Sequence, residues 1–137
     1  MQVLMTNELY RTLIEYSFSK LPEEACGFIL GQVLDQDAGF TAHSFAPMRN
    51  CAANPQLQFD IAPQDMVPFL VNTENHVIGI FHSHPTASPI PSEQDLQTLW
   101  HTIPTHWILS LQAPKQPELF LYQIKKASPT AFNKLRL

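Results

Sequence analysis

Glycine, cysteine and positive charge are all scarce in this sequence. Its 137 residues include 4 glycines and 2 cysteines, and 8 Lys and Arg stand against 12 Asp and Glu, for a formal net charge of −4. A surface that neutralises phosphates needs a basic face, so we expect no nucleic-acid partner. The sequence also lacks an apolar run of ~18 residues and the pattern of a signal peptide. These absences favour a cytoplasmic protein with no membrane partner.

The two cysteines, Cys26 and Cys51, could form at most one disulfide bridge. A core of this size does not require a bridge, so we interpret both as reduced thiols of a cytosolic protein. Cys26 lies in an apolar run, and a thiol in such a place is more often inert than nucleophilic. The sequence therefore gives no support to cysteine-based catalysis.

The length and the 45% share of hydrophobic residues predict a single folded domain over residues 1–137. A chain of this length is too short for a (β/α)₈ barrel. Helices are predicted over 8–20, 64–72 and 93–100, the first capped by Thr6 or Asn7. Strands are predicted over 25–34, 40–48, 77–82, 107–111 and 119–124, with a turn at 35–39 and a short extended piece at 58–61. This alternation favours an α/β fold with a mixed sheet. The last nine residues fit strand and coil equally well.

His82 and His84 are the first part of a candidate metal site. Residues two apart on a strand project from the same face, about 6.6 Å apart along it. Pro85 ends that strand, and the following loop allows Asp95, in the first turn of the next helix, to return as an oxygen ligand. Two histidines and one carboxylate leave the fourth tetrahedral position of Zn²⁺ open, which is typical of catalytic and not of structural zinc sites.

Each piece of this pattern has an alternative interpretation. A lone His-x-His is more often a pair of ordinary surface or core histidines. Ser92-x-x-Asp95 is also a capping box, with Ser92 as the N-cap and the acid at N3. We expect that an Asp95 bound to a metal cannot also cap the Ser92 amide well, so the two interpretations compete for one carboxylate.

The combined pattern resembles a known family. His82-Ser83-His84-Pro85, followed after six residues by Ser92 and then by Asp95, matches the JAMM motif of the MPN+ (JAB1/MPN/Mov34) metalloprotease family, in its short stand-alone prokaryotic form. That family carries an upstream Glu-x-x-Gly, and Glu24 precedes Gly27 at this spacing. Three of the four glycines, Gly27, Gly31 and Gly79, lie within these two segments. The resemblance implies a three-layer-like, cytidine-deaminase-like α/β fold, with a mixed, mostly antiparallel curved sheet flanked by helices.

The resemblance also implies a role for each motif residue. His82, His84 and Asp95 correspond to the zinc ligands of the family. Glu24 corresponds to the general acid/base, and Ser92 to the hydroxyl that steadies the oxyanion. The cofactor implied is Zn²⁺.

Several neighbouring residues are given other roles. Glu23 adjoins Glu24 but lacks the Glu-x-x-Gly spacing, and we favour Glu24. Ser83 is expected to point to the other face of the strand, as packing or support for the ligands. The remaining histidines, His43, His76, His101 and His106, are expected at the surface or an interface, and Trp100 and Trp107 in the core.

The family resembled here cleaves the amide bond after the Gly-Gly tail of ubiquitin or ubiquitin-like proteins, a tail usually held by β-addition. The short form resembles members associated with small ubiquitin-like or sulfur-carrier β-grasp proteins, which implies such a partner here. Residues 54–61 resemble a stretch near the groove of those members, and otherwise form a loop and edge strand. Two alternatives stay open: a non-catalytic scaffold, which typically lacks one or more motif residues, and a zinc hydrolase of another small amide. The natural substrate and oligomeric state stay open as well.

Overall fold

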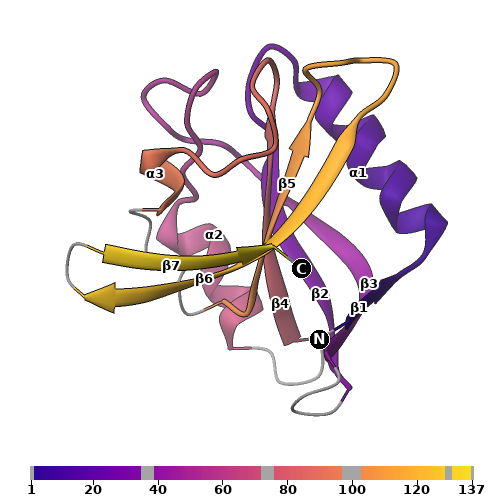
Figure 1. Cartoon of the computed structure of the whole chain (residues 1–137), viewed down its shortest axis with the longest axis vertical. Helices are drawn as coiled ribbons and strands as arrows, with labels where there is room; N and C mark the ends of the chain where they lie inside the picture. The colour runs from indigo at the N-terminus through magenta and orange to yellow at the C-terminus, as the bar shows by residue number, and fades with distance from the viewer. Residues whose placement is uncertain (1, 35–38, 72–75, 97–102, 129–130, 137) are drawn as a thin grey trace.

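One seven-stranded sheet organises the molecule, in the order β1-β3-β2-β4-β5-β6-β7 (Figure 1). The structure is a computed structural model and describes residues 2–34, 39–71, 76–96, 103–128 and 131–136. The strands are β1 (Gln2–Met5), β2 (Cys26–Val33), β3 (Gly39–Met48), β4 (His76–His84), β5 (Thr105–Ser110), β6 (Glu118–Ser128) and β7 (Ala131–Arg136). The helices are α1 (Asn7–Lys20), α2 (Pro63–Leu70) and α3 (Glu93–Leu96).

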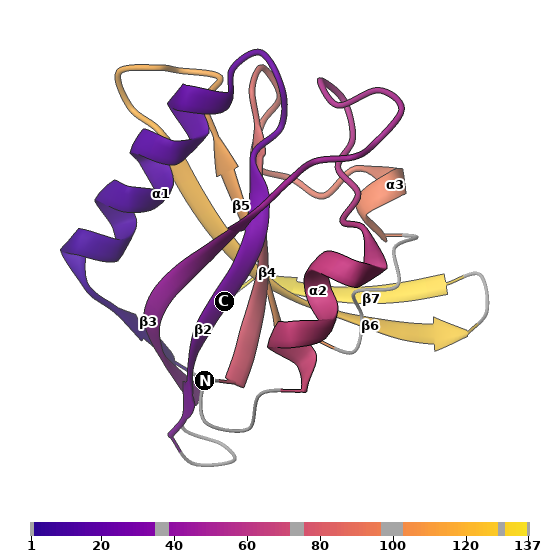
Figure 2. The ribbon, with the colours of Figure 1, turned by 180° about the vertical axis from the view of Figure 1, so that it is seen from behind.

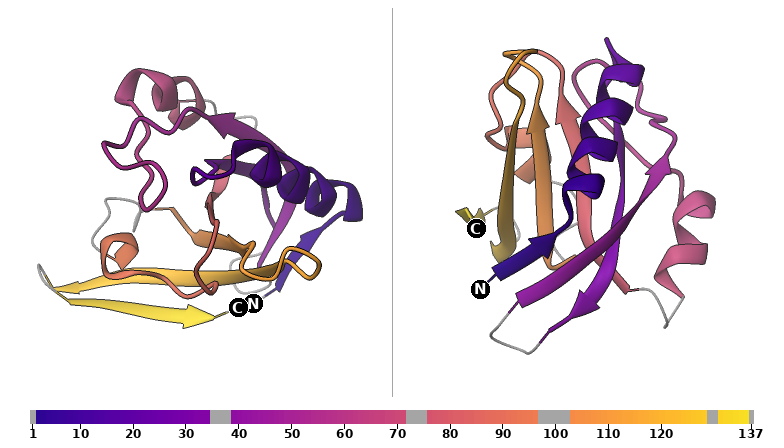
Figure 3. Two further views of the ribbon diagram at one scale, coloured as in Figure 1. Left: turned by 90° about the horizontal axis from the view of Figure 1, so that it is seen from above. Right: turned by 90° about the vertical axis from the view of Figure 1, so that its right-hand side faces the viewer.

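The sheet is mixed and mostly antiparallel. The pairs β1·β3 and β4·β5 are parallel, and the other four pairs are antiparallel. Figure 3 shows that the sheet is strongly curved and that the hairpin of β6 and β7 extends away from α1. The expected α/β fold with a curved mixed sheet flanked by helices is therefore confirmed.

Helix α1 begins where the sequence provides a cap. The Oγ1 atom of Thr6 accepts a hydrogen bond of 3.0 Å from the Leu9 amide, which satisfies one of the unpaired donors of the first turn. Leu9 and Leu13 are buried on one side of the helix and share a core cluster with Phe81 and Trp107 of the sheet. Trp107 is fully buried, as expected.

The other face of the central strands supports α2. Cys26, Phe28 and Ile80 belong to a second core cluster, against which Met66 and Phe69 of α2 pack. Alternation along β4 therefore sends Ile80 toward α2 and Phe81 toward α1. Apolar clusters cover both faces of the central strands, so the side chains at the ends of these strands stand on a well-packed support.

Two of the glycines stand where no side chain fits. A Cβ at Gly27 would lie 2.3 Å from the Ala46 carbonyl oxygen, and one at Gly79 would lie 2.6 Å from Nε1 of Trp107. Both distances are well inside van der Waals contact, so each position needs glycine for close approach of its neighbours. The glycine of the Glu-x-x-Gly segment is thus explained by packing in the sheet.

Several sequence-based predictions differ from the structure. Strand β1 was not predicted, β4 continues through His84, and residues 58–61 form no strand. The last nine residues include β7, whose partner is β6. His106, expected at the surface or an interface, is only 6% exposed because it faces inward from central strand β5. Residues 35–38 of the expected turn and residues 97–100 of the third helix, with Trp100 and His101, lie outside the described residues.

The described residues include no helix that is both long enough and apolar enough to cross a membrane.

Candidate metal centre

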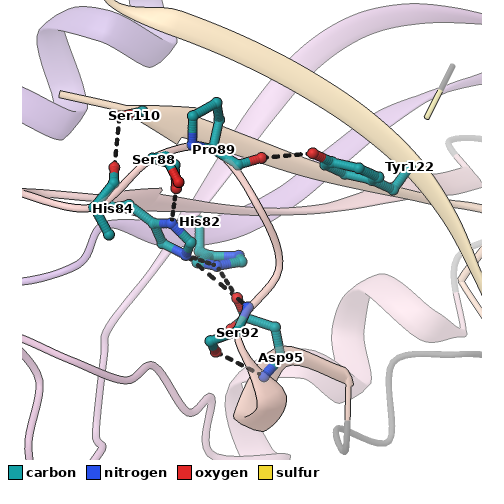
Figure 4. Close-up of polar contacts among 9 residues, drawn as sticks. His82, His84, Ser88, Pro89, Ser92, Asp95, Ser110 and Tyr122 are labelled. Carbon is teal, nitrogen blue, oxygen red and sulfur yellow. Dashed lines mark hydrogen bonds and ion pairs between the residues drawn. The ribbon is translucent and has the colours of Figure 1, made fainter. Parts of the chain in front are cut away.

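Three side chains from two elements converge at one end of the sheet. His82 and His84 stand at the end of β4, and Asp95 stands on α3. The Nε2 atoms of the two imidazoles are 3.0 Å apart, and Oδ2 of Asp95 lies 3.2 Å from that of His82 and 3.3 Å from that of His84. Figure 4 shows both imidazoles turned toward the carboxylate. The structure thus brings together the three residues that the sequence singled out as ligands.

These separations fit a small divalent ion. Ligand atoms at 2.0 to 2.1 Å from a tetrahedral Zn²⁺ stand roughly 3.3 Å from one another. The candidate ligand atoms all lie within 4.8 Å of one another. Each histidine is 5% exposed, so the cluster is shielded from water on the sheet side. The donor set of two imidazoles and one carboxylate matches the ligand types that zinc accepts.

His84 is oriented by the loop that follows it. Its Nδ1 atom lies 2.7 Å from the Ser88 carbonyl, which can only accept, so Nδ1 carries the proton and Nε2 presents its lone pair to the cluster. The loop is itself held by Ser110, which donates to Ala87 O at 2.6 Å, and by Tyr122, which donates to Pro89 O at 2.7 Å (Figure 4). Strands β5 and β6 therefore fix the geometry of a ligand on β4.

Burial favours the neutral form of His82. Its ring stacks on Phe59 with centroids 4.6 Å apart, and this burial lowers the pKa of His82 although Asp95 opposes the shift. A neutral imidazole is the form that binds a metal. Burial alone would raise the pKa of Asp95, but the adjacent His82 and the bonds to His82, His84 and Ser92 outweigh it and hold that pKa well below its usual range. Asp95 is therefore an ionised carboxylate.

Asp95 caps its helix and joins the cluster at the same time. The Ser92 amide donates to Oδ2 of Asp95 at 2.8 Å, and the Asp95 amide donates to Oγ of Ser92 at 3.1 Å. The same Oδ2 faces both histidines. One carboxylate oxygen has lone pairs for more than one partner, so in this geometry the capping bond leaves Oδ2 directed at both histidines.

Glu24 lies beside the cluster and is 6% exposed. Its Oε1 is buried and has no hydrogen-bond partner within the described part of the chain. Burial raises the pKa of Glu24 from 4.5 to about 8, with His84 opposing the rise and Asp95 adding to it. An orphaned buried carboxyl of this kind points to a functional role, because a purely structural carboxyl would be paired.

A cavity of about 220 Å³ joins Glu24 to the cluster. Its lining includes Glu24, His84 and Ser92, together with Leu57 and Ile90 at its mouth, which are 66% and 56% exposed. All five motif residues are therefore at or next to this cavity. Cys26, in contrast, is fully buried, and burial first and Glu24 second raise its pKa to about 12, as expected of an inert thiol.

Ser83 links the ligand strand to Glu24. Its Oγ accepts a 2.8 Å hydrogen bond from the Ala25 amide, and its own amide donates to the Ala25 carbonyl at 3.0 Å. Ser83 lies between the two histidines in the sequence, so the residue after Glu24 is held by the strand that carries both candidate ligands. The supporting role expected of Ser83 consists of these two hydrogen bonds to the main chain of Ala25.

We expect Ser83→Ala to destabilise the fold by about 1 to 3 kcal/mol, because it leaves the buried Ala25 amide without an acceptor. Zinc content should be unchanged, because no ligand is altered. Urea denaturation and elemental analysis measure the two effects. Ser44→Ala is the matched control, since Ser44 is an exposed strand serine on β3. Equal midpoints for the two variants would contradict this role.

Nothing in the sequence marked three residues that shape the site: Asn50, Ser110 and Tyr122. Asn50 lies outside every predicted helix and strand, and Ser110 and Tyr122 were ordinary positions of predicted strands. Asn50 reaches Glu24 across 26 residues, and Ser110 and Tyr122 reach the loop after His84 across 23 and 33 residues, so no local spacing could reveal these contacts. Residues 54–61, by contrast, were associated with the groove, and two of them, Gln56 and Leu57, line the cavity.

The fold and the side-chain cluster together define an α/β protein with a candidate divalent-metal centre. Residues 6–125 match the family model described as prokaryotic homologs of the JAB domain. The chain therefore belongs to this family, and the family predicted from the motif is confirmed.

Two curated relatives are both named desampylase. The one from Haloferax volcanii is 35% identical over 77 residues, which are 54% of this chain and 52% of that protein. The one from Pyrococcus furiosus is 33% identical over 91 residues, which are 63% of this chain and 58% of that protein. The chain thus spans only somewhat more than half the length of these relatives.

Solved structures share the fold. A protein from Desulfitobacterium hafniense aligns with a TM-score of 0.77 and 23% identity, over 98% of this chain and 90% of that one. A JAB1/MPN domain protein from Archaeoglobus fulgidus aligns with a TM-score of 0.54 and 20% identity, over 85% of this chain and 87% of that one. At these identities the similarity bears on the fold alone.

Proposed function

We propose that the chain is a zinc metallopeptidase of one domain, an isopeptidase that hydrolyses the amide bond after the C-terminal Gly-Gly of a ubiquitin-like or sulfur-carrier β-grasp protein. The observation that carries this proposal is the convergence of His82, His84 and Asp95 beside the buried carboxyl of Glu24. The name of the two relatives, desampylase, favours a hydrolase that removes a small protein modifier. The two free cysteines fit a cytoplasmic location.

His82, His84 and Asp95 would hold the metal through two Nε2 atoms and one carboxylate oxygen. Zinc bound there would act as a Lewis acid, which lowers the pKa of water to about 7 and polarises a carbonyl. The neutral His82, the ionised Asp95 and the Nδ1 contact of His84 to Ser88 prepare the ligands for this role. The residues present therefore fit the metal that the family resemblance implies.

Glu24 would move the proton. A general base works best when its pKa lies near the working pH, and burial brings the pKa of Glu24 to about 8. Its unpaired Oε1 is free to accept a proton from the attacking water and to deliver it to the leaving amine. No acyl-enzyme is needed in this scheme, which agrees with the inert character of Cys26.

Ser92 would stabilise the oxyanion that develops on the scissile carbonyl. Its Oγ accepts from the Asp95 amide, which leaves its own hydrogen available to donate into the cavity. A preorganised donor of this kind commonly contributes a factor of about 10² to 10³ to kcat.

The cavity suits the end of an extended chain. Apart from Glu24, Gln56 and His84, its walls carry small or apolar side chains, and Leu57 and Ile90 flank its mouth. A volume of about 220 Å³ accepts a tail of glycines more readily than one of bulky residues. This narrowness supports a Gly-Gly substrate.

The proposal is tested with a β-grasp ubiquitin-like protein whose terminal Gly-Gly is joined by an amide bond to a reporter peptide. The zinc-loaded protein is expected to release the reporter after the second glycine, as measured by intact-protein mass spectrometry. A matched probe ending in Val-Val should resist cleavage. Failure to cleave Gly-Gly probes of several ubiquitin-like and sulfur-carrier proteins would reject the proposal.

A further inference from the structure

The main chain of Glu24 is held from two directions. On one side, Ser83 of the ligand strand pairs with Ala25. On the other, the Glu24 amide donates a 2.8 Å hydrogen bond to Pro55 O, and the Glu24 carbonyl accepts one of 3.1 Å from Nδ2 of Asn50. The second set of contacts joins Glu24 to the loop between β3 and α2.

That loop forms one wall of the cavity without support from a sheet. Residues 50–62 contain no strand or helix, and Gln56 and Leu57 within them line the cavity beside Glu24. Figure 2 shows the loop at the same end of the molecule as α3. A wall without strand or helix must be held in place by other hydrogen bonds.

The side-chain amide of Asn50 makes five hydrogen-bonding contacts that hold the loop. The two hydrogens of its Nδ2 are shared among three carbonyl oxygens, those of Glu24 at 3.1 Å, Pro55 at 3.3 Å and Gln58 at 2.9 Å. Its Oδ1 accepts from the amides of Ala52 at 3.1 Å and Asp60 at 3.2 Å. One partly buried amide thus touches the start of the loop, its tip, its end and the main chain of Glu24.

We propose that Asn50 is a positioning residue that locks the Glu24 main chain and the cavity wall of residues 51–60 into one unit. This role rests on the proposed function, in which Glu24 is the general base. It is not the role of a metal ligand, because the hydrogen bonds of the Asn50 amide go to main-chain groups of Glu24 and of the wall.

The chemistry of the amide explains why asparagine stands here. Three carbonyl oxygens surround Nδ2 and two amide hydrogens point to Oδ1, so the site needs a donor and an acceptor on one short side chain. Aspartate has nearly the same shape but would place a second oxygen against the three carbonyls. A displacement of about 1 Å at a catalytic group can lower the rate about 100-fold.

The test is Asn50→Asp, compared with Asn7→Asp. Asn7 is an exposed asparagine at the start of α1, outside the cavity wall, so the control makes the same change of charge. In Asn50→Asp, amide hydrogen exchange at Glu24 should be at least about 10-fold faster, because its bond to Pro55 O loosens. With the Gly-Gly probe, kcat should fall about 10- to 100-fold and KM should change less. Zinc content should stay near that of the wild type, and Asn7→Asp should match the wild type in zinc content, kcat and exchange at Glu24.

Unchanged exchange at Glu24 together with unchanged kcat would overturn the proposal, and so would a loss of zinc that accounts for the fall in activity. If Asn50→Asp does not fold, Asn50→Ala introduces no charge and is judged by the same measurements. If the wild type cleaves no Gly-Gly probe, the isopeptidase proposal fails on its own, and the exchange rate at Glu24 still decides whether Asn50 holds it.

Discussion

His84→Ala is expected to lose zinc and all hydrolysis that depends on it. The substitution removes one of three candidate ligands, and it removes the Nδ1 contact that orders the loop at Ser88. Two remaining ligands hold a divalent ion poorly. We therefore expect zinc content to fall from about one per chain to near zero, and cleavage of the Gly-Gly probe to fall by more than about 1000-fold. Elemental analysis and the probe assay measure these changes.

His43→Ala is the matched control for this loss. His43 is an exposed histidine on β3, away from the cluster, so its removal should leave both zinc content and activity unchanged. If His84→Ala kept the zinc content of the wild type, His84 would not be a metal ligand, and the proposed reaction at this site would be wrong.

Glu24→Gln is expected to keep zinc and lose hydrolysis. Glutamine has the size of glutamate but cannot accept the proton of the attacking water, and general base catalysis typically contributes about 10² to 10⁴ in rate. We expect kcat to fall within that range or beyond. Because the ligands are intact, the variant should still bind substrate and can serve to capture proteins that end in, or are joined through, Gly-Gly.

The same substitution should stabilise the metal-free protein at high pH. The pKa of Glu24 is about 8 when folded, against 4.5 as its ordinary value, so between these pH values the folded state binds more protons than the unfolded state. Stability of the wild type therefore falls as pH rises through this window. In EDTA, Glu24→Gln should melt about 3 to 8 °C higher than the wild type at pH 8, and at the same temperature at pH 4.

Glu23→Gln is the control for both measurements, because Glu23 is exposed and adjacent in sequence. It should keep full activity and the melting temperature of the wild type. If Glu23→Gln abolished hydrolysis while Glu24→Gln did not, the assignment of the base from the Glu-x-x-Gly spacing would be wrong.

The strongly patterned parts of the chain could be predicted from the sequence. Thr6 capped the first helix, the apolar runs gave the central strands, and the spacing of His82, His84 and Asp95 gave the cluster. The helix cap and the strands depend on residues that are close together in the sequence, and the cluster depends on a residue spacing typical of metal ligands. Strand β1 was missed because its four residues are short and mostly exposed, and they become a strand only by pairing with β3.

The supports of the site could not be predicted in the same way. Tyr122 holds the loop at Pro89 from 33 residues away, and Ser83 reaches Ala25 across 58 residues. Asn50 appears in sequence as an ordinary loop residue, yet its amide lies among five main-chain groups. No periodicity records such contacts.

The sequence by itself determined the family, the order of the central elements and the identity of the candidate ligands, because each follows from local patterning and from the fixed chemistry of histidine and carboxylate. Only the tertiary structure decided that Asp95 can cap and face the histidines through one oxygen, that Glu24 is buried with an unpaired oxygen, and that the cavity wall depends on one amide. The physical reason is that burial, and the pKa shift it causes, belong to the packed surroundings of a group and not to its place along the chain.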